Sequence, residues 1–112
     1  MEITTNEYSV KYDAETSTVY WQGIMRLDRK QYEPISRLLH EVVSLKPSWM
    51  IMDLRNLDAL NSSGISMLGR FISSLENGKN LPVVIQGAKE IYWQEKWIDI
   101  FQQVMPSLKL EW

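Results

Sequence analysis

The polar and hydrophobic positions near the start of the chain alternate as they do in half-buried β-strands. Residues 8–12 alternate between Tyr or Val and polar side chains, a period of two that predicts a strand. Residues 18–26 predict a second strand, in which Val19 and Trp21 share a face. Gly23 interrupts this strand and predicts a bulge or a close approach of another backbone segment. The short connection between the two strands predicts an antiparallel hairpin.

Three later segments have the spacing of amphipathic helices, with apolar side chains three or four residues apart. These segments are residues 31–44, with Ile35, Leu38, Leu39 and Val42; residues 63–76; and residues 89–104, with Trp97, Phe101 and Val104. Gly78 and Lys79 predict the end of the second helix. The apolar runs 49–52 and 81–85 predict strands buried on both faces, as in a parallel sheet. Residues 108–112 alternate again and predict a last short strand.

The order of these elements is ββαβαβαβ, which indicates an α/β fold. Strands that alternate with helices predict right-handed crossovers and a mixed, mostly parallel sheet, here preceded by the antiparallel hairpin. The chain has 112 residues, the common size of one domain, and contains no internal repeat or plausible linker. We therefore expect one domain over residues 1–112 with three main helices.

Composition narrows the classes of function. Twelve basic residues against 14 acidic ones give a net charge of -2, which argues against direct binding of nucleic acid. No apolar run approaches the roughly 18 residues of a membrane span, so we expect no membrane insertion. The chain has no cysteine and one histidine, so we expect no metal site and no cofactor. Its start has no signal-peptide pattern, and a cytoplasmic protein is expected.

The five tryptophans divide by position. Trp21, Trp49 and Trp112 fall on predicted strands and are expected in the core. Tyr92, Trp93 and Trp97 surround the start of the third helix, and an exposed member of this group would mark an interface, where aromatic residues are enriched.

The most informative segment leads from the strand at residues 49–52, through a loop, to the start of the second helix. Asn61, Ser62 and Ser63 are all good N-cap residues, but a helix uses only one. At least one serine hydroxyl is therefore left free beside the positive end of the helix dipole, and Gly64 has no side chain to obstruct it. A phosphate there would meet backbone N–H groups. Helix capping is the alternative function of either serine.

This segment resembles the signature of STAS domains, named for sulfate transporters and anti-sigma-factor antagonists. The resemblance lies in Asp53-Leu54, the following loop, Ser62-Ser63-Gly64 and the apolar helix, and it extends over nearly the whole chain. In the bacterial antagonists the usual pattern is Asp-Ser-Ser-Gly, and the second serine accepts phosphate. The resemblance therefore implies Ser63 as the phosphorylation site, with Ser62 as the alternative. Asn61 replaces the aspartate, which keeps the hydrogen-bonding shape and loses the charge.

The resemblance also implies how such a protein acts. The family's antagonists bind and do not catalyse, so no catalytic residue is expected. Unphosphorylated antagonist docks on an anti-sigma factor that is also a GHKL-type serine kinase, which releases a sigma factor for transcription. Phosphorylation ends the complex, and a PP2C-type phosphatase restores it. We expect a monomer or weak dimer, with partner contacts around the helix start: Asn61, Ser62, Gly64, Met67, Arg70 and Asp58. Peripheral core packing is the alternative for Met67.

Two other functions stay open. The first is a STAS subunit that docks on the cytoplasmic ATPase of a membrane transporter without phosphorylation, which the change to Asn61 favours. The second, from another class, is a small phosphate-ester hydrolase that uses Asp53 and Asp58. Against it, a structural function of Asp53 at the end of its strand, accepting N–H groups of the loop, is the preferred interpretation.

Overall fold

The computed structural model describes residues 1–76 and 80–112, and in these residues six strands and three α-helices are present. The predicted helix end at Gly78 and Lys79 lies outside the described residues. The elements are β1 (Glu2–Thr4), β2 (Tyr8–Asp13), β3 (Thr18–Met25), the short 3-10 helix η1 (Lys30–Tyr32), α1 (Glu33–Ser44), β4 (Met50–Leu60), α2 (Ser62–Glu76), β5 (Val83–Gln86), α3 (Gln94–Val104) and β6 (Lys109–Glu111).

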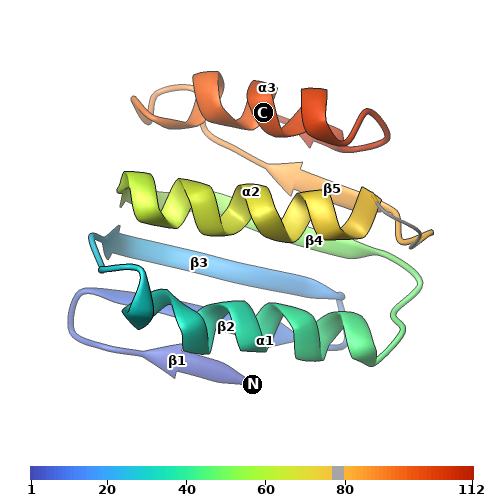
Figure 1. Cartoon of the computed structure of the whole chain (residues 1–112), viewed down its shortest axis with the longest axis horizontal. Coiled ribbons are helices and arrows are strands. Elements are labelled where there is room, and N and C mark those ends of the chain that lie inside the picture. Colours follow the sequence, from blue (N-terminus) through green and yellow to red (C-terminus); the bar gives the residue numbers. More distant parts are fainter. Residues whose placement is uncertain (77–79) are drawn as a thin grey trace.

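The strands lie in one sheet in the order of the sequence, from β1 to β6. The pairs β1–β2 and β2–β3 are antiparallel, and the pairs β3–β4, β4–β5 and β5–β6 are parallel. Because successive parallel strands are neighbours and their crossovers share one hand, all three helices cover the same face (Figure 1). The predicted α/β fold with a mixed sheet, an N-terminal hairpin and three helices is confirmed. Strand β1, which carries a single apolar residue, was not predicted.

The core fills the space between the sheet and this single layer of helices. All four residues of the predicted stripe on α1 are buried, as is Trp21 on β3, so these predictions are confirmed. Burying one such aliphatic side chain contributes roughly 1.5–3 kcal/mol. The largest fully buried side chains come from both layers: Trp21, Tyr32, Phe71, Met25, Ile35, Leu39, Met50, Met52, Leu54, Leu57, Leu68 and Ile72.

No helix formed by residues 1–76 and 80–112 lies over the opposite face of the sheet, which corrects one prediction. Ile51 on β4 and Val84 on β5 are half-buried, so these strands are buried on one face and not on two. Trp49 is 47% exposed and Trp112 is 44% exposed, so their expected core positions are wrong. A continuous apolar run fits a two-sided parallel strand, but here no second layer of helices covers it.

Strand β4 is longer than predicted, because the expected loop at residues 53–61 continues the strand to Leu60. Its pairing with β3 shifts by one residue at two places, so β4 carries two β-bulges. Gly23 on β3 has a φ of 97°, and a Cβ on it would lie 2.8 Å from the Cα of Tyr8. The predicted close approach at this glycine is confirmed.

Helix α3 begins five residues later than predicted. Its buried side chains are Gln94, Ile98 and Phe101, whereas Val104 is exposed and Trp97 is half-buried. Phe101 is buried as predicted, whereas the buried face passes through Ile98 and not through Trp97 or Val104, so the predicted stripe is correct at one of its three positions. The cause is Gln94, a polar residue that is fully buried because its side chain bonds to the backbone of β4.

Candidate functional site

The candidate site lies where β3 and β4 end and α2 begins, at the left-hand end of the molecule in Figure 1. In parallel sheets of α/β proteins, the carboxyl ends of the strands are where ligands usually bind. Ser62 and Ser63 are the first two residues of α2. Ser62 is exposed and Ser63 is half-buried. The predicted position of the two serines at a helix start is confirmed.

Asn61 caps helix α2. Its Oδ1 accepts the N–H of Gly64 at 3.1 Å and the hydroxyl of Tyr32 at 2.6 Å, and its Nδ2 donates to the carbonyl of Leu27 at 2.7 Å. This set of partners requires one acceptor and one donor on the same side chain. An aspartate would have no donor for the Leu27 carbonyl. Asparagine at this position therefore has a structural reason in this chain.

Tyr32 is the buried side chain that holds Asn61 in place. Burial raises the pKa of the Tyr32 phenol, so the hydroxyl stays protonated over the physiological range and can donate to Asn61. The same hydroxyl lies 3.2 Å from the carbonyl of Met25. Sequence reasoning missed Tyr32, because nothing in its local pattern indicates a contact with a helix start that follows 29 residues later.

The cap by Asn61 leaves both serines free. Within the described residues, the hydroxyls of Ser62 and Ser63 make no hydrogen bond. The expectation that at least one serine stands free beyond the cap is met by both. Because a helix start also has unpaired backbone N–H groups, this is a favourable place for added negative charge.

The two serines open into a small polar hollow of about 240 Å³. We call it the serine hollow; its lining residues are Arg29, Ser62, Ser63, Ser66 and Arg70. An adjoining hollow of about 200 Å³ is lined by Arg29, Tyr32, Glu33, Ser36, Met67 and Arg70. Arg29 and Arg70 line both hollows and therefore stand between them. Sequence reasoning singled out Arg70 and missed Arg29, which lies on the connection from β3 to α1.

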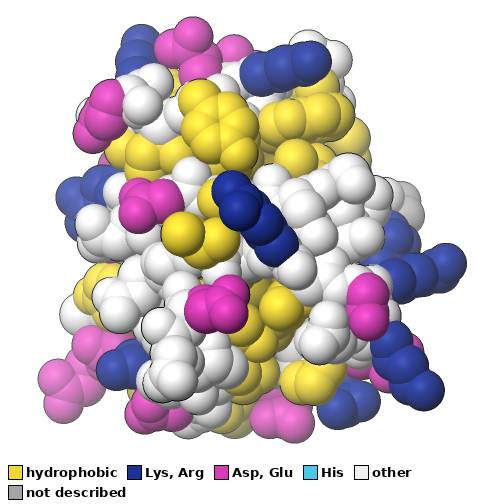
Figure 2. Space-filling view, turned by 90° about the vertical axis from the view of Figure 1, so that its left-hand side faces the viewer, with side chains coloured by type: hydrophobic (Ala, Val, Ile, Leu, Met, Phe, Trp, Pro, Cys, Tyr) yellow, Lys and Arg dark blue, Asp and Glu magenta, His cyan; other side chains and the backbone are white. Residues whose placement is uncertain are grey.

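The described residues that line the serine hollow include two arginines and no acidic side chain. The ion pairs among the described residues are Lys11–Glu2, Arg55–Asp53 and Lys89–Glu95, and none involves Arg29 or Arg70. The N-terminus of α2 adds to the positive potential. Figure 2 views this end of the molecule, where charged side chains of both signs are interspersed and hydrophobic ones gather toward α3.

The other predicted contact residues differ in their positions. Met67 is 3% exposed and belongs to the core, as its alternative interpretation held, so only the adjoining hollow gives access to it. Asp58 is exposed on β4 and lines neither hollow. Gly64 is buried, and a Cβ on it would meet Leu60 and lie 2.6 Å from the hydroxyl of Tyr32. Glycine is therefore required at this position for packing, and not to open an approach to the serines as expected.

An exposed aromatic residue lies on the segment before α3. Tyr92 is 78% exposed, while its neighbours Trp93 and Gln94 are buried. Trp93 Nε1 donates to the carbonyl of Leu57 at 3.0 Å, and Gln94 Nε2 donates to the carbonyls of Leu54 and Leu57. These bonds tie the segment to the part of β4 that extends beyond β5. Tyr92 is thus presented to solvent from a well-anchored backbone.

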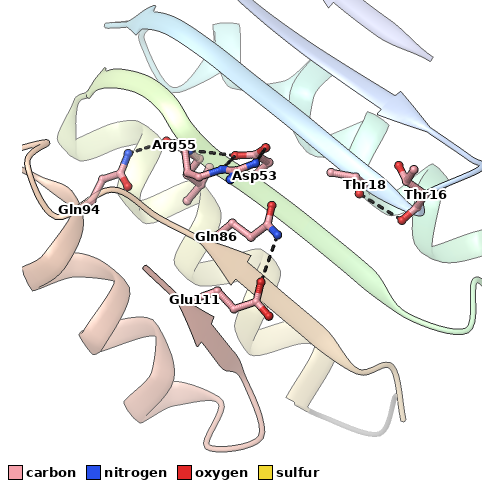
Figure 3. Close-up of polar contacts among 8 residues, drawn as sticks. Thr16, Thr18, Asp53, Arg55, Gln86, Gln94 and Glu111 are labelled. Carbon is pink, nitrogen blue, oxygen red and sulfur yellow. Dashed lines mark hydrogen bonds and ion pairs between the residues drawn. The ribbon is translucent and has the colours of Figure 1, made fainter.

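Asp53 lies on the uncovered face of the sheet, with both oxygens taken up by Arg55 (Figure 3). The Arg55 guanidinium donates at 3.0 and 2.8 Å, and its backbone N–H donates at 3.1 Å. Burial alone would raise the pKa of Asp53, but these bonds outweigh it and hold the pKa below its ordinary value. Asp53 is 4% exposed and lies inside β4, not at a strand end as expected. It accepts N–H groups as predicted, but they belong to Arg55 on the same strand and not to a loop.

Neither the models of known protein families nor the curated proteins give a match to this chain. Over residues 1–76 and 80–112, no helix is long and apolar enough to cross a membrane. The same residues contain no group of three or more His, Asp or Glu side chains that could hold a metal ion.

Proposed function

We propose that this chain is a non-catalytic STAS-type signalling module of the bacterial cytoplasm, which binds a protein partner through the start of α2. We further propose that phosphorylation of Ser63, with Ser62 as the alternative, switches this binding. The observation that carries the proposal is the cap by Asn61. It leaves both serine hydroxyls without hydrogen bonds at an accessible helix start in a basic hollow.

The arrangement of the elements supports the family assignment. The Ser-Ser-Gly sequence stands at the start of the helix that follows β4, as the resemblance implies. The elements that follow β1 have the order ββαβαβαβ on which the resemblance draws. The proposed partner is a GHKL-type serine kinase that also acts as an anti-sigma factor.

Phosphorylation would act through charge at this surface. The kinase transfers the γ-phosphoryl group of ATP: the bond from Ser63 Oγ to phosphorus forms, the bond to the leaving ADP breaks, and the hydroxyl proton is released. The product carries about -1.5 to -2 additional charges at the helix start. A partner that docks on the unmodified, positively charged hollow then meets a changed potential, and it dissociates. A PP2C-type phosphatase would hydrolyse the ester and restore docking.

Partner contacts in this proposal are divided between two kinds of residue. Ser62, Arg70 and Arg29 are exposed and available for contact, and Tyr92 is an exposed aromatic side chain on the segment before α3. Asn61 acts by holding the helix start in position. Exposed arginine and aromatic residues are the types most enriched at protein interfaces.

The alternatives have weaker support. A hydrolase based on Asp53 needs a carboxylate that is free to react, whereas both oxygens of Asp53 are bound by Arg55. The transporter-bound alternative drew on Asn61 as a lost phosphorylation motif. The hydrogen bond from Asn61 Nδ2 to the Leu27 carbonyl offers a structural explanation for asparagine at this position.

The experiment uses purified chain as bait in lysate from its own cells, followed by a kinase assay with the recovered partner and labelled ATP. We expect recovery of a GHKL-type kinase that labels the wild-type chain and Ser66→Ala, but not Ser63→Ala. Ser66 is the matched control because it lines the same hollow. Labelling of both Ser63→Ala and Ser62→Ala at the wild-type level would contradict the proposal. Recovery of a transporter ATPase without labelling of the chain would favour the transporter-bound alternative.

A further inference from the structure

The serine hollow contains two arginines that form no ion pair among the described residues, and the proposed function uses them only as part of the surface that a partner contacts. Arg29 and Arg70 line it together with the serines, and no carboxylate lines it. We propose that these two arginines form an intramolecular clamp that holds the phosphate group of phosphorylated Ser63. The biological use of this clamp rests on the proposed phosphorylation, but the clamp itself can be tested without any kinase.

The spacing along α2 brings Arg70 toward the serines. Ser63, Ser66 and Arg70 are separated by three and four residues, so they lie on one face of the helix. Side chains on a helix lean toward its N-terminus, which directs the long Arg70 side chain toward Ser63. Arg29 approaches from the β3–α1 connection. The carbonyl of Leu27 on this connection accepts a hydrogen bond from Asn61, which fixes the position of the connection relative to α2.

The size and charge of the serine hollow fit a phosphate monoester. A volume of about 240 Å³ is several times the roughly 30 Å³ that one water molecule occupies in the liquid, so it holds a phosphate with some of its hydration. Two guanidinium groups balance the -1.5 to -2 charge of the phosphate, and arginine can bond two phosphate oxygens at once. An acidic residue, Glu33, lines the adjoining hollow.

On the uncovered sheet face two basic side chains are paired with a carboxylate, whereas Arg29 and Arg70 form no ion pair among the described residues. Arg55 is bound to Asp53, and Lys11 lies 4.0 Å from Glu2. An aspartate at position 61 would place a negative charge beside the serines and compete for the arginines. Asn61 leaves the hollow without this competing charge. Phosphorylation would therefore withdraw two arginines from the surface, in addition to adding negative charge.

The test incorporates phosphoserine at position 63 during synthesis and follows the phosphate by ³¹P NMR as the pH is changed. The second pKa of a phosphoserine is ordinarily about 6. Paired arginines favour the dianion, so we expect a pKa lower by about one unit, which corresponds to a tenfold change. The matched control is phosphoserine at position 107, an exposed serine in a hollow whose described lining residues include Glu76 and no basic residue.

The substitutions Arg29→Gln and Arg70→Gln, alone and together, separate the clamp from the effect of the helix start. Each should raise the second pKa of phosphoserine 63, and the double variant should raise it furthest, so that only the effect of the helix start remains. Both arginines are exposed, and denaturant unfolding of the unmodified variants checks that the fold is retained. A pKa at position 63 that does not respond to either substitution would overturn the clamp. Because the phosphate is incorporated directly, failure of a kinase to modify Ser63 would affect only the proposed function.

Discussion

Replacing Asn61 by alanine tests how the start of α2 is held, and with it the claim that the serines are free. The substitution removes the cap on Gly64, which costs about 1 kcal/mol in proteins. It also leaves the part-buried carbonyl of Leu27 without its donor, for about 1 kcal/mol more. Tyr32 can keep a bond to the carbonyl of Met25 at 3.2 Å. The expected loss of unfolding free energy is about 2 kcal/mol.

The assay is urea unfolding followed by circular dichroism, with Ser62→Ala and Ser63→Ala as matched controls. If Asn61 is the cap, each serine variant stays within about 0.5 kcal/mol of the wild type. Asn61→Asp keeps an oxygen for Gly64 but cannot donate to Leu27, so its loss should be about 1 kcal/mol. A serine variant that loses as much as Asn61→Ala would show that a serine caps the helix, and the reasoning would fail.

Three further predictions concern the surroundings of the site. Gly64→Ala should cost about 1–3 kcal/mol by overpacking against Tyr32, whereas Gly69→Ala, whose Cβ would lie 3.8 Å from its nearest neighbour, should be neutral or stabilising in thermal unfolding. The pKa of Asp53 is lowered in the folded protein, so its ionised carboxylate contributes to the free energy of unfolding above the ordinary pKa of an aspartate. This contribution is lost as the pH falls through the folded-state pKa. Replacing its partner Arg55 by Ala should therefore reduce stability at pH 7 and much less at pH 3, and an equal loss at both would contradict this. Gln94→Ala should cost about 2–3 kcal/mol in urea unfolding, because the Leu54 carbonyl loses its side-chain donor and the Ala88 N–H loses its acceptor, while the Leu57 carbonyl keeps Trp93. A loss below about 0.5 kcal/mol would refute it.

Local patterns predicted the parts of the fold that depend on neighbours in sequence. The stripe on α1, the β2–β3 hairpin and the place of Ser62 and Ser63 at a helix start were all evident from spacing. The exposure of Trp49 was not. An apolar run shows that a strand has two apolar sides, but only the number of helical layers decides whether both are covered.

The site was predictable only in part, for a related reason. Three consecutive residues could have capped α2, and the choice of Asn61 depends on Tyr32 and on Leu27, a residue 34 positions away. Arg29 reaches the serine hollow from the same distant connection. No local pattern records such contacts. The function of Gly64 was misjudged because a missing side chain opens space inward as readily as outward.

The most direct measurement of the central claim is phosphopeptide mapping of this protein isolated from its own cells, with intact-mass analysis of the same sample. The account predicts a fraction with a single phosphate, located on Ser63 or, in the alternative, on Ser62. Protein that carries no phosphate under any growth condition, or that carries it only at a serine outside the start of α2, would contradict the account.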